Sequence, residues 1–131
     1  MADHNVEGHL DVLLKIWTSA PWNELWQQLS CDVESFPRLG IAFDTPDAEL
    51  WRICQQEDIL LLTGNRNAEG EESLEATIQS QRTADSLPVF TIADPARVLT
   101  DRDYAERVAE RILEYLLDLE SLRGAGRLYV P

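Results

Sequence analysis

The stretch of residues 58–67 constrains the fold of this chain most, because it joins a buried-strand pattern directly to a polar turn. The apolar residues Ile59, Leu60, Leu61 and Leu62 follow one another without interruption. Such a run predicts a short strand that is covered on both faces, as in a parallel sheet. In open α/β sheets, sites are built just beyond the carboxyl ends of the strands. The first candidate functional residues are therefore Thr63, Asn65, Arg66 and Asn67.

Helices and strands are predicted to alternate along the rest of the chain. Helical spacing of apolar residues predicts helices over residues 6–17, 22–29, 45–56, 73–81 and 101–122. We place the start of the third helix at Thr45 as the N-cap, with Pro46 in the first helical position. Strands are predicted over residues 58–63 and 88–92, with a last edge strand over 127–131. Residues 31–43 suit a short strand followed by an irregular connection.

This alternation predicts an α/β fold with a mostly parallel central sheet between two layers of helices. We expect one domain over residues 1–131, with the strand at residues 58–63 at the centre of the sheet. Trp17, Trp22 and Trp26 form an aromatic cluster that belongs either to the core or to an interface. That cluster and the long last helix are the two candidate surfaces for a homodimer.

The net charge of the chain limits the classes of molecule that its surface can bind. The sequence holds 24 Asp and Glu against 11 Lys and Arg, a formal net charge of −13. Such a surface repels phosphate backbones, which argues against non-specific nucleic-acid binding by the bulk surface. It leaves room for a small metal-dependent site, because a bound divalent cation reverses the local potential.

The remaining composition suggests a compartment. Two cysteines are too few for a disulfide scaffold or a cysteine-based zinc site, and Cys54 is expected to be a buried free thiol. No apolar run is long enough to span a membrane, and the first residues lack a secretory signal. We therefore expect a cytoplasmic protein without a membrane partner.

The candidate residues have carboxylate and amide side chains, whose oxygen atoms can bind a metal ion. Asp3 would follow a first strand reduced to Met1 and Ala2, and Asp47 opens a helix. Such carboxylates, together with amides at the same sheet edge, could hold a hard cation such as Mg²⁺. Each residue also has an ordinary structural explanation, because aspartates favour helix starts and surfaces, and asparagines favour turns.

Three short motifs resemble those of small stand-alone bacterial PIN-like proteins. Ala2-Asp3-His4-Asn5 resembles their opening aspartate motif, and Thr45-Pro46-Asp47-Ala48-Glu49-Leu50-Trp51 resembles their second acidic motif. The run from Ile59 through Thr63-Gly64-Asn65-Arg66-Asn67 resembles their strand that ends in Thr-x-Asp-x-Asp. The motifs occur in the order of the family and span about half of the chain.

The resemblance implies a Rossmann-like α/β fold and a Mg²⁺- or Mn²⁺-dependent ribonuclease, often dimeric and often the toxin of a toxin–antitoxin pair. Asp3 and Asp47 would be the catalytic, metal-binding carboxylates, and Asn65 would occupy a later acidic position of the catalytic set. Thr63, Arg66 and Asn67 would lie on the substrate side. RNA would be the substrate, and an antitoxin or another protein the partner.

This sequence departs from the family pattern in its third motif, where Asn65 and Asn67 replace both acids. Neutral carbonyl ligands lower the charge and the metal affinity of the site. Three hypotheses follow: a weakened metal-dependent ribonuclease, a catalytically silent PIN-like module for binding or dimeric assembly, and an unrelated α/β domain. In the first, Arg66 or Lys15 would contact phosphate.

Overall fold

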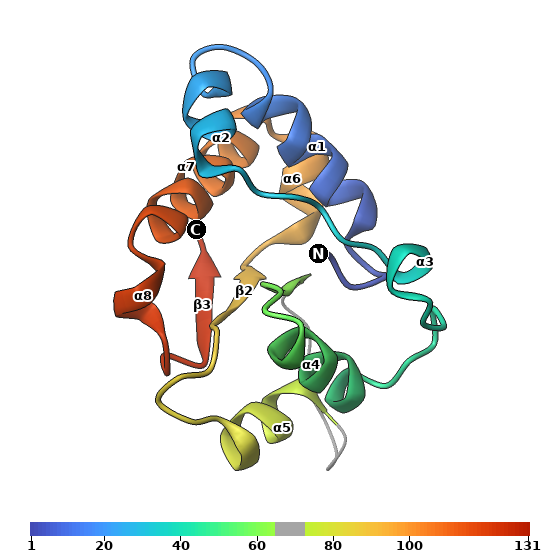
Figure 1. Cartoon of the computed structure of the whole chain (residues 1–131). Helices are drawn as coiled ribbons and strands as arrows, with labels where there is room; N and C mark the ends of the chain where they lie inside the picture. Colours follow the sequence, from blue (N-terminus) through green and yellow to red (C-terminus); the bar gives the residue numbers. More distant parts are fainter. Residues whose placement is uncertain (65–72) are drawn as a thin grey trace.

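A computed structural model describes residues 1–64 and 73–131, which form a parallel sheet covered by helices (Figure 1). The strands are β1 (Leu62–Gly64), β2 (Val89–Ile92) and β3 (Arg127–Val130), in the spatial order β1-β2-β3 with both pairings parallel. The predicted α/β class and parallel sheet are confirmed. The predicted centre is wrong, because β2 is the middle strand and β1 lies beside it.

The described residues contain eight helices. They are α1 (Glu7–Trp17), α2 (Asn23–Leu29), α3 (Phe36–Leu39), α4 (Asp47–Gln56), α5 (Leu74–Gln81), α6 (Pro95–Thr100), α7 (Arg102–Leu117) and α8 (Leu119–Leu122). No helix in this part of the chain combines the length and the apolar character needed to cross a membrane.

The start of the chain adds a single bridging residue to the sheet. Ala2 pairs with Leu62 in parallel, as the Leu62 N–H donates to the Met1 carbonyl at 2.8 Å and the Asp3 N–H to the Leu62 carbonyl at 2.9 Å. The predicted short first strand is thus present only as this isolated bridge at Ala2. The register places Asp3 beside Thr63, at the carboxyl edge of the sheet.

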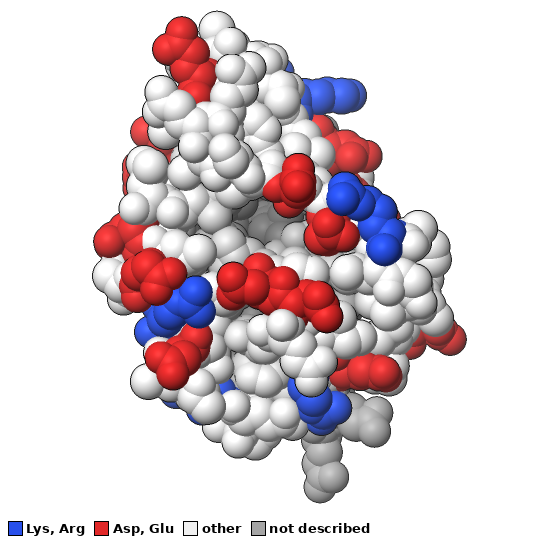
Figure 2. Space-filling view, viewed as in Figure 1, with Lys and Arg blue, Asp and Glu red and all other residues white. Residues whose placement is uncertain are grey.

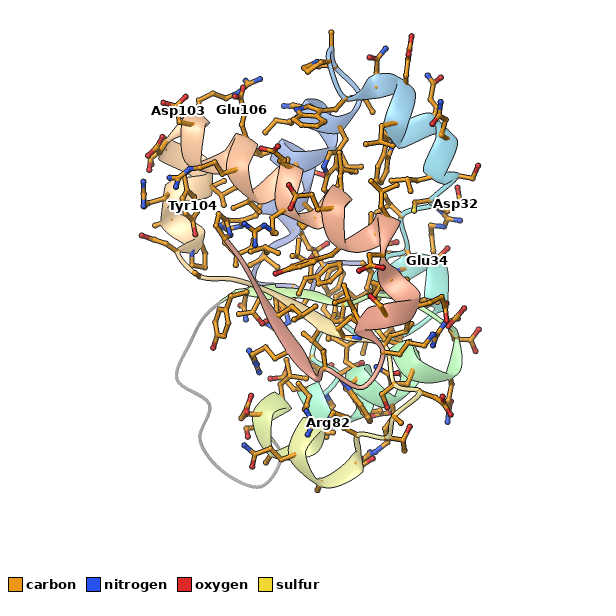
Figure 3. The ribbon with its side chains drawn as sticks, turned by 90° about the vertical axis from the view of Figure 1, so that its left-hand side faces the viewer. Asp32, Glu34, Arg82, Asp103, Tyr104 and Glu106 are labelled. Carbon is orange, nitrogen blue, oxygen red and sulfur yellow. The ribbon has the colours of Figure 1, made fainter. Side chains whose placement is uncertain are left out.

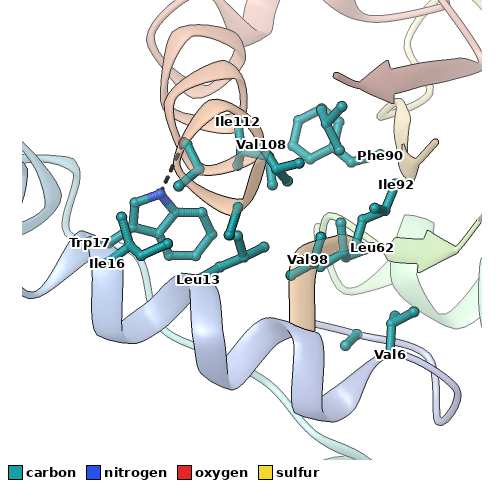
Figure 4. Close-up of a cluster of buried hydrophobic side chains, with 14 of the residues drawn as sticks. Val6, Leu13, Ile16, Trp17, Leu62, Phe90, Ile92, Val98, Val108 and Ile112 are labelled. Atoms are coloured by element: carbon teal, nitrogen blue, oxygen red, sulfur yellow. Dashed lines mark hydrogen bonds between the residues drawn. The ribbon is translucent and has the colours of Figure 1, made fainter. Parts of the chain in front are cut away.

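Both faces of the sheet are buried, as the unbroken apolar runs predict. Neighbouring strand residues point to opposite faces, so Leu62 and Phe90 enter one core cluster while Leu61 and Val89 enter another. The larger core cluster joins the sheet to α1, α6 and α7 (Figure 4), and the smaller joins it to α3, α4 and α5. The larger cluster contains Ala2, Val6, Leu13, Ile16, Trp17, Leu62, Phe90, Ile92, Val98, Tyr104, Ala105, Val108, Ala109, Ile112, Leu113 and Val130.

Trp17 fastens α1 to α7. Its indole N–H donates to the Ala109 carbonyl at 3.0 Å, the bond that Figure 4 draws as a dashed line, and its ring stacks on Trp26 with centroids 4.7 Å apart. Trp17 is buried, whereas Trp22 and Trp26 are partly exposed. The core interpretation of the tryptophan cluster is therefore confirmed for Trp17.

The strand predicted from residue 58 begins later, because the first residues of the predicted range form the turn that follows α4. Asp58 has a φ of 59°, and the Ile59 N–H donates back to the Cys54 carbonyl at 2.8 Å. This is the reverse turn that commonly closes a helix C-terminus, in which the left-handed residue is usually glycine or asparagine. The ladder then starts at Leu62.

Four further features differ from the sequence prediction. Residues 31–43 contain no strand, because Ser35 caps the short helix α3 by accepting from the Arg38 N–H at 3.3 Å. Thr45 is not an N-cap, since its hydroxyl donates to the Ala42 carbonyl at 2.6 Å and Pro46 takes the cap position. The last predicted helix is interrupted at Asp118, and α6 was not predicted.

Gly64 provides a test of the packing at the carboxyl end of β1. A Cβ atom there would lie 2.9 Å from Pro95 Cγ and 3.1 Å from Val6 Cγ1. We expect Gly64→Ala to lower the free energy of unfolding by about 1–3 kcal/mol through overpacking. Gly8→Ala is the matched control, because its Cβ would meet nothing within 4 Å and alanine favours helix. Urea titration of both variants checks this, and an equal effect of the two substitutions would contradict it.

Candidate functional site

The carboxyl edge of the sheet holds Asp3 in a fixed position. The residue is only 3% exposed, and its Oδ1 accepts from the Asn5 N–H at 2.9 Å. The Val6 N–H donates to the Asp3 carbonyl at 3.1 Å, so the backbone turns directly into α1. This local turn is typical of aspartate, and it orients the carboxylate without any distant residue.

The carboxylate of Asp3 lacks a cationic neighbour among the described residues. No Lys or Arg side chain within residues 1–64 and 73–131 forms an ion pair with it. Burying an uncompensated carboxylate is costly, so this position favours a cation. The donor is a hard oxygen, the type that Mg²⁺ and Mn²⁺ prefer.

Thr63 and Gly64 complete this edge beside Asp3. Thr63 is 1% exposed, and its hydroxyl donates to the Gly64 carbonyl at 3.4 Å. Gly64 lies where the starts of α1 and α6 meet, in contact range of Val6 and Pro95. Thr63 lies inside β1, one residue before Gly64, the last residue of the strand, and its predicted role toward a substrate stays a prediction.

Ring contacts connect the segments that carry the two predicted aspartates. The His4 ring meets Phe36 at a centroid distance of 6.4 Å, and Phe36 stacks on Phe43 at 5.2 Å. Phe43 precedes Asp47, which lies partly exposed in the first turn of α4. The segments that carry Asp3 and Asp47 thus both contact Phe36 through aromatic rings. Among the described residues, no direct contact between the two carboxylates is seen.

Asn65, Arg66 and Asn67 lie outside the described residues. Among the residues that are described, no three His, Cys, Asp or Glu side chains are grouped so that they could hold a metal ion. Lys15 lies exposed in the last turn of α1, at the opposite end of that helix from Asp3.

The carboxyl end of β2 carries polar residues that the sequence did not indicate. The Asp94 N–H donates to the Tyr104 hydroxyl at 2.9 Å. The Tyr104 ring lies 4.4 Å from the Arg97 guanidinium carbon and 5.5 Å from that of Arg107. Arg97 also pairs with Asp101 at 3.0 Å, which lowers the pKa of that carboxyl through the hydrogen bond. The pair Asp94-Pro95 is an ordinary helix start and was the one available signal.

A cavity of about 540 Å³ lies at the other end of the sheet. Its walls are apolar side chains from α1, α2, the sheet and α7. It is bounded by residues that precede the strands, such as Leu60 and Leu87, which places it at the amino edge. The apolar lining residues include Leu10, Trp17, Trp26, Leu62, Phe90 and Leu116.

Acidic residues surround this cavity. Asp32, Glu34, Glu57, Asp58 and Glu120 are among its lining residues, whereas Arg123 is the one Lys or Arg among them. Figure 2 shows a hollow in this face with Asp and Glu side chains on two sides of it. Five of the 24 Asp and Glu residues of the chain therefore lie around one cavity with apolar walls, which the net charge alone does not reveal.

Comparison with protein-family models, with curated proteins and with solved structures finds no match to this chain. The fold and the site geometry define the class to which it belongs, an α/β protein built on a three-stranded parallel sheet in its described part. Any assignment beyond that class depends on the residues described above.

The thiol reactivity of the two cysteines tests the burial of two regions, because Cys31 lines the cavity and Cys54 lies in the smaller core cluster. Cys31 is exposed and lines the cavity, and partial burial raises the pKa of its thiol. Burial raises the pKa of the Cys54 thiol to about 11. We expect Ellman's reagent at pH 8 to label one thiol in the folded protein and the second only after denaturation, because the thiolate is the reactive form. Cys31→Ser should remove the native reaction, and labelling of both thiols in the folded protein would contradict the burial of Cys54.

Proposed function

We propose that the chain is a PIN-like domain that cleaves RNA in a metal-dependent reaction at the carboxyl edge of its sheet, with Asp3 and Asp47 holding Mg²⁺ or Mn²⁺. One observation carries the proposal. Asp3 is a buried carboxylate at this edge, and no described Lys or Arg pairs with it. A cation at this position would compensate a charge that is otherwise costly to bury.

Each residue of the proposed site would have a separate role. Asp3 would hold the ion with the oxygen left over by the Asn5 N–H, and Asp47 would approach from the first turn of α4. A bound divalent cation supplies an activated water and charge stabilisation for phosphodiester hydrolysis. Asn65 would belong to the catalytic set with Asp3 and Asp47, while Thr63, Arg66 and Asn67 would lie on the substrate side. Only two carboxylates would then contribute charge, which implies weak metal binding.

A second candidate function is a catalytically silent PIN-like module that binds a ligand or a partner. The asparagines at positions 65 and 67 favour it, because they remove acidic charge from the site. The cavity at the amino edge also favours it, since apolar pockets of this kind are common binding sites. An antitoxin or a second copy of the chain would be the partner suggested by the family resemblance.

Calorimetric titration with MnCl₂ tests the proposed metal site. We expect the wild-type protein to bind the ion, and Asp3→Asn and Asp47→Asn each to weaken binding by about tenfold or more, because each removes a charged ligand. Asp85→Asn is the matched control, since Asp85 is exposed in the loop that precedes β2, at the opposite end of the sheet. Circular dichroism confirms that each variant is folded.

A cleavage assay on a single-stranded RNA with the same proteins separates the two candidate functions. Metal-dependent cleavage that is lost in Asp3→Asn and Asp47→Asn, and kept in Asp85→Asn, supports the nuclease. If the wild-type protein binds no Mn²⁺ and cleaves no RNA, the silent module is the better description. Equal Mn²⁺ binding by all four proteins would assign the heat to the acidic surface instead.

A further inference from the structure

We propose that the cavity at the amino edge of the sheet binds a small organic ammonium compound that has an apolar body. This site is separate from the carboxyl edge, where the proposed nuclease chemistry lies. The inference does not depend on that chemistry. It rests on the size of the cavity, its apolar walls and the sign of the charge around it.

The walls suit an apolar body of moderate size. A volume of about 540 Å³ falls within the roughly 300–1,000 Å³ of typical small-molecule pockets. Leu10, Leu62, Phe90 and Leu116 present hydrocarbon to the interior from two helices, α1 and α7, and from the sheet. Trp26 adds an indole ring that is held in place by stacking on Trp17 at 4.7 Å.

The charges around the cavity select the sign of the ligand. Five carboxylates line it against the single guanidinium of Arg123. That guanidinium is already engaged, since it contacts Glu120 at 2.9 Å and donates to the Asp85 carbonyl at 2.9 Å. Glu34 is paired with Arg38 at 3.2 Å. The Met1 amine also borders the cavity, but it donates to the Leu60 carbonyl at 2.7 Å, and burial lowers its pKa.

Two carboxylates are left without compensation in the described structure. Neither Asp32 nor Glu57 forms an ion pair with a described Lys or Arg. Asp32 comes from the segment between α2 and α3, and Glu57 from the turn between α4 and β1, so the two reach the cavity from different parts of the fold. An ammonium group is the ligand chemistry that complements both of them. As the occupant of this cavity, a second copy of the chain is less suitable than an ammonium compound, because the copy carries the same formal charge of −13.

Three probes of the same shape test the sign of the ligand. They are 4-phenylbutylamine, 4-phenylbutanol and 4-phenylbutyrate, which are cationic, neutral and anionic at pH 7. In calorimetric titrations we expect the amine to bind about tenfold more tightly than the alcohol, and the butyrate to bind most weakly. Raising the NaCl concentration to about 0.5 M should reduce the difference between amine and alcohol, because salt screens the charges at the exposed rim.

Two double variants with the same change of charge locate the effect. Asp32→Asn/Glu57→Gln should weaken the amine about tenfold and leave the alcohol unchanged. The control, Asp103→Asn/Glu106→Gln, neutralises two acids at the start of α7, which Figure 3 shows on the side of the molecule away from Asp32 and Glu34. It should change neither affinity. Leu116→Trp should weaken both the amine and the alcohol by filling the cavity.

Several outcomes would overturn the inference. Equal binding of the amine and the alcohol by the wild-type protein would show that the rim does not select charge. An equal loss of amine binding in both double variants would assign the attraction to the net charge of the protein. If Leu116→Trp does not fold, the comparison of the two double variants still decides. Because none of these probes contains a phosphodiester and no metal is added, failure here leaves the proposed nuclease function untouched.

Discussion

The parallel pairing of β2 with both of its neighbours is the constraint on which the rest of the structure depends. Parallel strands cannot be joined by hairpins, so each connection has to cross a face of the sheet. The crossing from β1 to β2 carries α5 in the smaller core cluster, and the crossing from β2 to β3 carries α6 and α7 in the larger one. Both faces are therefore buried, and functional groups are left to the two edges of the sheet. The candidate metal site and the cavity lie at these two edges.

Much of the fold could be predicted because the signals were local. The apolar run that ends at Leu62 predicts β1, and the helical spacing of apolar residues predicts α5 and α7; each of these signals lies within the element itself. The boundaries that failed depend on interactions that sequence spacing does not contain. Asp58 adopts a left-handed conformation to end α4, and α3 forms in a segment whose apolar residues were read as a strand.

The candidate sites differ in how far they could be predicted. Asp3 was accessible to sequence reasoning, because an aspartate after a short strand has a predictable edge position in a parallel sheet. The cavity was not, since its lining comes from α1, α2, α7 and the sheet, which lie far apart in the sequence. Its rim acids, among them Asp32 and Glu57, are indistinguishable in the sequence from any solvated carboxylate. Only the packing of α2 and the following segment over the sheet brings them together.

Asp58 has two roles, one in the backbone turn that ends α4 and one in the charge around the cavity. The same residue reverses the backbone after α4, at a φ of 59°, and contributes a carboxylate beside the cavity. Glycine would adopt this conformation at lower conformational cost, and would thereby remove the charge. Stability and charge thus make opposite demands on one position. A homologous chain with glycine at this position would have a less strained helix end and a less acidic cavity. The residue type found there would therefore show which of the two properties that chain retains.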